Sequence, residues 1–226
     1  MSNKLAPEEP VIDDQSSRGQ FLKLAGGTGA AGALAIFLAA CGEDEKKEDS
    51  SGSGSGSAEK KPKADKGDLA IVNYALTLEY LESDFYQQVI DSGEVKTKAI
   101  VEVAKTFAQD EMEHVQALTA TVEQLGGKPA PKPKGKFDSV LAGGEKKILA
   151  TAAVVENLGA SAYLGQAGKI KSKEVLAAAL SIHSVEARHA AVLNQVTGKS
   201  IVPDGAFAKP ADMATVLKAI KPFIAA

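Results

Sequence analysis

The stretch Ser181–Leu193 reads SIHSVEARHAAVL, and it decides how the rest of the chain is interpreted. Its surroundings are rich in alanine and leucine, which indicates a buried helix. Glu186 and His189 stand three residues apart, nearly one helical turn, so their side chains point to the same face. A buried charge is costly unless it is paired or binds a metal. This pair therefore needs a compensating partner.

A matching pair lies earlier in the chain. DEMEHVQAL aligns without gaps on VEARHAAVL, which places Glu111 and His114 on Glu186 and His189. Upstream, ALTLEYLESDFY aligns in the same way on AAVVENLGASAY. Each of these segments holds a Glu followed seven residues later by a Tyr: Glu79 and Tyr86 in the first, Glu156 and Tyr163 in the second. The sequence therefore contains two related helical hairpins.

Composition and periodicity predict an all-α fold. Aromatic residues make up 5% of the chain and hydrophobic residues 44%, with abundant alanine, which favours helix over sheet. Apolar residues recur at helical spacing over 68–93, 94–127, 144–170 and 172–199, and over a short segment, 209–223. We expect Ser172 to cap the fourth helix and Pro210 to lie in the first turn of the fifth.

The connections predict the topology. Short links around 92–94 and 169–172 make each pair of helices antiparallel neighbours. The middle segment, 126–144, is rich in Pro and Lys and too poor in apolar residues for a core element. About 17 extended residues span about 50 Å, more than the roughly 36 Å of a helix of about 24 residues. This predicts a four-helix bundle with one long crossover; a plain up-down bundle with a floppy middle loop is the alternative.

The four Glu and two His resemble the ligand set of the ferritin-like superfamily, the di-iron or di-manganese carboxylate proteins. More narrowly, LEYLE…FY and VE…RH resemble motifs of bacterial ferritin-like domain proteins, over Asp68 to about Gly198. The resemblance implies that the Glu residues hold and bridge two metals and that the His residues cap them. The implied ligands are Glu79, Glu111, His114, Glu156, Glu186 and His189. Two iron ions are expected, or alternatively manganese, because the ligands suit both.

Further polar residues stand close to these motifs. Glu82 follows Glu79 by three residues but aligns with Gly159, so it is a candidate additional ligand or gate. Asp110 and Glu113 are interpreted as solvated residues or as partners of a ligand.

Two tyrosines and a third histidine complete the candidate residues. Tyr86 and Tyr163 could hydrogen-bond a ligand carboxylate or pass electrons, or could be core aromatics with one polar tip. His183 aligns with Ala108, so the repeat does not support it as a ligand, and it is interpreted as a surface residue or a partner of a ligand.

Residues 1–41 have the layout of an export signal. Arg18 and Lys23 precede a Gly- and Ala-rich apolar run that ends in LAAC, at Cys41, the only cysteine of the chain. This resembles a bacterial lipoprotein signal in which the cysteine is lipidated. SRGQFLK also resembles the twin-arginine export motif, with Gly19 in place of the second arginine, so the general secretory route stays open. An uncleaved transmembrane helix is the alternative.

The remaining organisation follows from composition. Residues 42–67 contain almost nothing apolar and are expected to be a disordered linker, which leaves 68–226 as the bundle domain. The chain is therefore expected to be tethered to the outer face of the cytoplasmic membrane, or to lie in the periplasm or cell envelope. A net charge of -3 without a basic stripe gives no reason to expect nucleic acid as a partner.

The resemblance implies oxidase-type activity: oxidation of Fe(II), or disposal of peroxide or dioxygen, with catalase-like chemistry if the metal is manganese. The expected partners are metal ions, O2 or peroxide, and the membrane through an N-terminal lipid, and a homodimer is left open. The rival interpretation is a non-catalytic metal-binding or envelope stress module, because fold alone does not fix function. A hydroxylase acting on an organic substrate is a third, and it needs an apolar cavity beside the metals.

Overall fold

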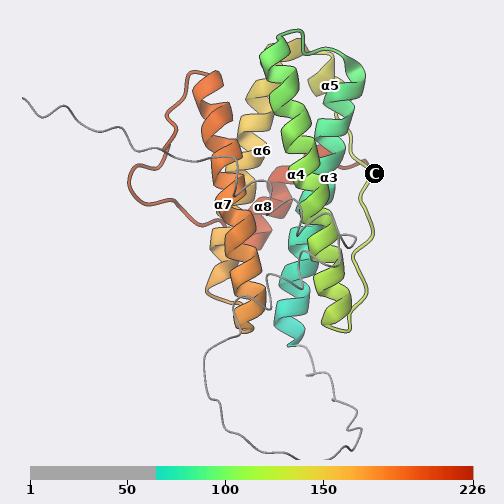
Figure 1. The fold of residues 1–226 in the computed structure, drawn as a ribbon, viewed down its shortest axis with the longest axis vertical. Helices are drawn as coiled ribbons and strands as arrows, with labels where there is room; N and C mark the ends of the chain where they lie inside the picture. Colours follow the sequence, from blue (N-terminus) through green and yellow to red (C-terminus); the bar gives the residue numbers. More distant parts are fainter. Residues whose placement is uncertain (1–64, 226) are drawn as a thin grey trace, which may run out of the picture.

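Four long helices form a bundle in the computed structural model, which describes residues 65–225 (Figure 1). The long helices are α3 (Lys66–Ser92), α4 (Lys98–Gln124), α6 (Gly144–Ala167) and α7 (Lys173–Val196). Three shorter elements are α5 (Asp138–Leu141), α8 (Met213–Ile220) and the 3-10 helix η1 (Lys221–Phe223). The predicted all-α bundle with a short C-terminal helix is confirmed. The predicted export signal, Cys41 and most of the predicted linker lie outside the described residues.

Local sequence sets where the helices begin and end. The Asp65 carboxylate accepts a hydrogen bond of 2.8 Å from the backbone N–H of Gly67, so α3 begins two residues before the predicted domain boundary. Gly93 adopts a φ of 61°, a left-handed conformation that ends α3 as predicted. The Ser172 hydroxyl accepts a hydrogen bond from the backbone three residues on, which confirms the predicted cap of α7.

The segment between α4 and α6 runs along the bundle from one end to the other, so that α4 and α6 point in the same direction (Figure 1). Asn73, near the start of α3, holds this crossover by bonds to the carbonyl oxygen of Lys128 (3.3 Å) and the N–H of Ala130 (2.6 Å). About three turns further along α3, Asp84 accepts a hydrogen bond of 3.1 Å from the N–H of Gly135. The crossover topology is therefore observed, and the plain up-down alternative is wrong.

The end of the crossover belongs to the core, contrary to the prediction that this segment is too polar. Phe137 and Val140 are only 2% and 4% exposed, and Phe137 packs edge-on against Phe85 with ring centroids 5.0 Å apart. At Gly135 the crossover also pairs in antiparallel fashion with Ile224 of the C-terminal segment. These two apolar residues stand in a Pro- and Lys-rich context with no periodicity, so the sequence pattern does not reveal their burial.

The chain reaches α8 by crossing over α6. The N–H of Ala211 donates a hydrogen bond of 2.9 Å to the carbonyl of Ser161 on α6. The side chain of Asp212 then caps α8. Pro210 therefore precedes the helix, and the prediction that it lies in the first helical turn is wrong, because this part of the chain is fixed across α6.

α6 is the one helix of residues 65–225 that is long and apolar enough, by length and composition only, to cross a membrane. In the structure it is a core helix: Ala152 and Ala153 are 2% and 0% exposed. It also carries the fully buried Glu156. Its apolar composition is accounted for by packing inside the bundle.

Candidate metal centre

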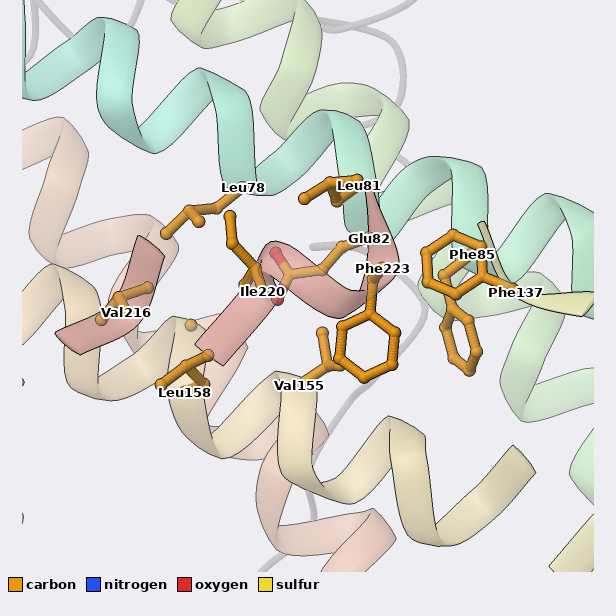
Figure 2. A pocket seen from close by; sticks show the side chains of 11 residues that line it. Leu78, Leu81, Glu82, Phe85, Phe137, Val155, Leu158, Val216, Ile220 and Phe223 are labelled. Atoms are coloured by element: carbon orange, nitrogen blue, oxygen red, sulfur yellow. The ribbon is translucent and has the colours of Figure 1, made fainter. Parts of the chain in front are cut away.

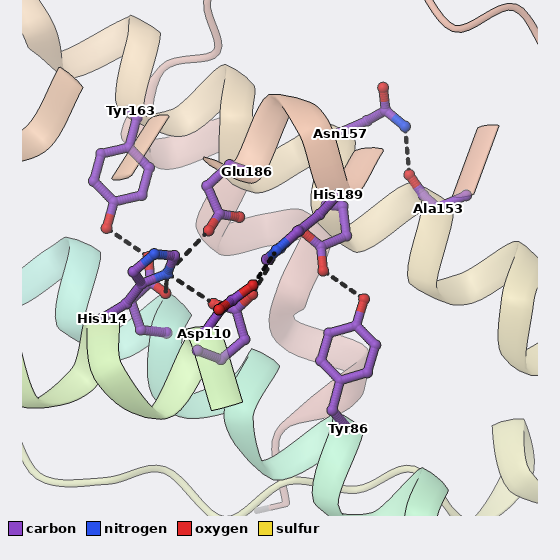
Figure 3. A network of polar contacts seen from close by, with 11 residues as sticks. Tyr86, Asp110, His114, Ala153, Asn157, Tyr163, Glu186 and His189 are labelled. Carbon is purple, nitrogen blue, oxygen red and sulfur yellow. Dashed lines mark hydrogen bonds and ion pairs between the residues drawn. The ribbon is translucent and has the colours of Figure 1, made fainter. Parts of the chain in front are cut away.

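The structure brings the six predicted ligand residues together inside the bundle, and each long helix contributes (Figure 3). They are Glu79 on α3, Glu111 and His114 on α4, Glu156 on α6, and Glu186 and His189 on α7. All four carboxylates are 0% exposed, and the two imidazole side chains are 11% and 4% exposed. A buried set of this charge needs compensation by protons or by metal ions.

The six residues form two overlapping groups. The His114 group is Glu79, Glu111, His114 and Glu186, and the His189 group is Glu111, Glu156, Glu186 and His189. Within each group, one ligand atom from every residue lies within 4.8 Å of the others. Glu111 and Glu186 belong to both groups. Two ions could therefore sit side by side, with two carboxylates between them and one Glu and one His on each outer side.

His114 faces three carboxylates through one nitrogen. Its Nδ1 atom lies 3.1 Å from Glu79 Oε2, 3.1 Å from Glu111 Oε2 and 3.2 Å from Glu186 Oε1. These oxygens come from α3, α4 and α7. A single atom of His114 is thus at the meeting point of three helices.

His189 is oriented from both sides of its ring. Its Nδ1 atom lies 3.0 Å from Glu111 Oε1 and 3.4 Å from Glu156 Oε2. On the opposite edge, Nε2 lies 3.1 Å from Asp110 Oδ2 on α4. Phe107 stacks on the ring with centroids 3.8 Å apart and planes at 25°. Nε2 therefore donates to Asp110, which leaves Nδ1 to the cluster.

The atoms left unpaired in this cluster fit a metal site. Glu111 Oε1, Glu156 Oε2, both oxygens of Glu186 and His189 Nδ1 are buried and make no well-formed hydrogen bond among residues 65–225, although some lie close together, such as His189 Nδ1 and Glu111 Oε1 at 3.0 Å. Buried polar atoms without partners are rare and need an explanation. Carboxylate oxygen and imidazole nitrogen together suit iron and manganese. The donor set therefore fits a pair of such ions.

The charges of the cluster shift the pKa values of its members. Burial raises the pKa of Glu186 well above its usual range, and the neighbouring carboxylates raise it further. Burial also raises the pKa of Glu111 to about 7, although its close contacts with the two histidines oppose this. Burial lowers the pKa of His189, but the carboxylates of Glu111 and Glu156 beside its Nδ1 atom outweigh this effect and raise the pKa to about 11. These shifts favour the binding of protons by the cluster, so metal ions must compete with protons for its ligand atoms.

Two tyrosines tie the hairpins together. Tyr163 on α6 donates a hydrogen bond of 2.5 Å to Glu79 on α3, and Tyr86 on α3 donates one to Glu156 on α6 (Figure 3). Each tyrosine therefore holds the Glu of the opposite hairpin. Of the roles predicted for this pair, the geometry supports hydrogen bonding to a ligand carboxylate.

Glu82 lies beside the cluster but outside both groups. It is 3% exposed, and its Oε2 atom has no hydrogen-bond partner among the described residues. Burial raises its pKa well above the usual range, and Glu186 and other carboxylates add to this. The aligned residue, Gly159, leaves it room: a Cβ there would lie 2.9 Å from Glu82 Oε1 and from Glu186 Oε2. Glu82 forms the polar end of an apolar pocket between α3, α6 and α8 (Figure 2).

The other candidates lie away from the ligand atoms. His183 is half-buried, with Nδ1 3.1 Å from the carbonyl oxygen of Ala160, so it is not brought into the cluster. Glu113 is exposed and bonded to Gln109. Phe107 was not predicted, although it precedes Glu111 by four residues and so lies on the same helical face. That spacing is the one feature of the sequence that could have indicated it.

The sequence pattern that defines the ferritin-like domain family matches residues 67–199. The chain belongs to the ferritin-like domain family. The match covers more than half of the chain, and it includes all six residues of the two groups but not α8. No curated protein matches the sequence. Membership in the ferritin-like domain family agrees with the bundle topology and with a buried carboxylate and histidine cluster that could bind metal.

Proposed function

We propose that this ferritin-like domain holds a dinuclear metal centre and uses it to oxidise Fe(II) or to remove peroxide or dioxygen. Iron is the expected metal, with manganese as the alternative. The observation that carries the proposal is the sharing of Glu111 and Glu186 by two groups that each contain one histidine. Once bound, such a metal pair supplies redox chemistry that protein side chains lack.

The residues of this chain have distinct roles in the proposal. Glu79 and His114 would hold one ion, Glu156 and His189 the other, and Glu111 and Glu186 both. Tyr163 and Tyr86 would fix the carboxylates of Glu79 and Glu156 by hydrogen bonds. The fully buried position of the four carboxylates would exclude bulk water from the site.

The two apolar cavities beside the cluster favour a small reactant over an organic substrate; a larger one of about 330 Å³, beside His183, is lined by none of the six ligand residues. One apolar pocket ends at Glu82, and a second, toward the start of α3, is lined by Tyr163 and Leu118 among others. In each, only about 20 Å³ is open to a water-sized molecule, and a single water needs about 10–15 Å³. Dioxygen or peroxide fits this space, whereas the organic substrate of a hydroxylase would have to displace side chains.

The proposal includes a membrane tether, which the sequence alone supports. Cys41 directly follows LAA at the end of an apolar run, and a polar stretch separates it from α3. We therefore propose that the protein is exported and lipid-anchored to the outer face of the cytoplasmic membrane. Fatty-acid labelling in cells should mark the chain and should be lost in a Cys41→Ala variant. Equal labelling of both would contradict the anchor.

The metal proposal is tested on the purified full-length chain. After anaerobic loading, elemental analysis should find about two metal ions per chain, and Fe(II) added with dioxygen or with peroxide should be oxidised faster than in buffer. Glu111→Ala should lose both ions, because Glu111 belongs to both groups. Glu113→Ala, an exposed residue on the same helix, is the matched control. Two ions without turnover would favour the non-catalytic module, and no bound ion would contradict the centre.

A further inference from the structure

Asp110 makes the two halves of the cluster unequal. Its carboxylate accepts the hydrogen bond of 3.1 Å from His189 Nε2. In the aligned repeat, the residue that corresponds to Asp110 is Val185, whose side chain has no acceptor to offer His114. The device that fixes the ring and tautomer of His189 therefore has no equivalent at this position of the other half.

Phe107 adds to the difference. It stacks on His189 at a centroid distance of 3.8 Å, and the residue that corresponds to it in the repeat is Ile182, which has no ring. The His189 side chain is 4% exposed, against 11% for His114. The His189 ring is thus oriented before a metal binds, by the hydrogen bond from Nε2 to Asp110 and by stacking on Phe107. A ligand held in this way loses less conformational freedom on binding.

We propose that the two metal positions fill in order, the His189 position first and the His114 position second. This inference rests on the proposed dinuclear centre and adds an order to it. Loss of the hydrogen-bond partner of a metal-binding His typically weakens metal binding about 10- to 100-fold. We expect the two dissociation constants to differ by at least about the lower factor. The first ion also neutralises part of the charge of Glu111 and Glu186, which weakens the attraction for the second.

The order has a consequence for regulation of the site. At metal concentrations between the two dissociation constants, the chain carries one ion in the His189 position and lacks a complete pair. The pair assembles only when metal is more abundant. The His114 position is then the exchangeable one, and chemistry that needs both ions responds to the metal supply.

The test is a titration of the metal-free full-length chain with Mn(II), with the free ion measured by its electron paramagnetic resonance signal. The parent should bind two ions in resolved steps. His114→Ala should keep the tight step and lose the weak one, and His189→Ala should do the reverse. Circular dichroism of each variant confirms that the helices are retained.

The role of Asp110 is tested in these single-site chains. With His114→Ala, adding Asp110→Ala should weaken the remaining tight site about 10- to 100-fold. Asp110→Asn keeps a hydrogen-bond acceptor at this position and should weaken metal binding less than Asp110→Ala does. With His189→Ala, the same Asp110→Ala change should leave the weak site within about twofold. Glu113→Ala, an exposed change on the same helix, should affect neither site.

Three outcomes would overturn the order. They are equal affinities for the two ions, loss of the tight step in His114→Ala, and equal weakening of both single-site chains by Asp110→Ala. Asn and Ala at position 110 behaving alike would contradict the hydrogen-bond argument for the order. Failure of the parent to bind any Mn(II) is a different result, because it contradicts the dinuclear centre itself and the order with it.

Discussion

Glu186 is the residue whose replacement best separates metal binding from folding. Its carboxylate is 0% exposed; its Oε1 atom lies 3.2 Å from His114 Nδ1, but neither oxygen makes a well-formed hydrogen bond among the described residues. A buried polar group left unpaired costs about 1–3 kcal/mol. Burial and the neighbouring carboxylates raise the pKa of Glu186 well above its usual range, so this carboxyl group is held at a cost to the fold. His114 keeps Glu79 and Glu111 at 3.1 Å when Glu186 is replaced, so no imidazole is left without a carboxylate. We therefore expect Glu186→Leu to raise the free energy of unfolding of the metal-free protein by about 2 kcal/mol.

Calorimetry of the chelator-treated chain measures this effect. For a domain of this size, about 2 kcal/mol corresponds to a rise in Tm of about 4–8 °C. Because Glu186 belongs to both groups, added Mn(II) should raise the Tm of the parent but not of the variant. Glu113→Leu, on an exposed site, should change the unfolding free energy by less than about 0.5 kcal/mol and keep the metal response. A metal-free Glu186→Leu chain that melts below the parent would refute the reasoning, since the carboxylate would then stabilise the fold.

Three further predictions concern pH, packing and hydrogen bonding. The carboxylates beside His189 raise its pKa to about 11, and the pKa values of Glu111 and Glu186 are raised as well, so metal must displace more than one proton. Metal affinity should therefore fall at least about tenfold for each pH unit lowered from 8 to 6, and a pH-independent dissociation constant would contradict this. A Cβ at Gly165 would lie 1.9 Å from the carbonyl oxygen of Ala211, so Gly165→Ala should destabilise the protein by about 1–3 kcal/mol and speed hydrogen exchange in α8. Gly168→Ala, with open space around the Cβ, should do neither. Tyr163→Phe should weaken metal binding about tenfold with little change in circular dichroism, and unchanged affinity would show that its hydrogen bond does not support the site.

The ligand set could be predicted from the sequence because a repeated helical spacing fixes which side chains share a face. Glu111 and His114 are three residues apart, as are Glu186 and His189. In any α-helix this spacing places both side chains on one face, independently of tertiary contacts. The gapless repeat then pairs them with Glu79 and Glu156. The long crossover was predictable for a different reason. Segment 126–144 is long enough to run the full length of the bundle and is rich in Pro and poor in apolar residues, which disfavours a fifth long helix.

The remaining features depend on contacts between distant segments, which a spacing rule does not encode. Asp110 on α4 accepts a hydrogen bond from His189 on α7. In the sequence of α4 alone, nothing distinguishes Asp110 from a solvent-exposed acidic residue. Phe137 is buried because Phe85 and the C-terminal segment pack on it, not because its neighbours are apolar. Pro210 precedes α8 because the chain before it is held across α6. In each case the tertiary partner decides the outcome.

Anomalous X-ray diffraction from crystals of the iron-loaded protein, collected at the iron absorption edge, tests the central claim most directly. The structure predicts two iron peaks per chain inside the bundle, one beside His114 and one beside His189, with Glu111 and Glu186 in contact with both. A single peak, or peaks that these six residues do not surround, would contradict the dinuclear centre.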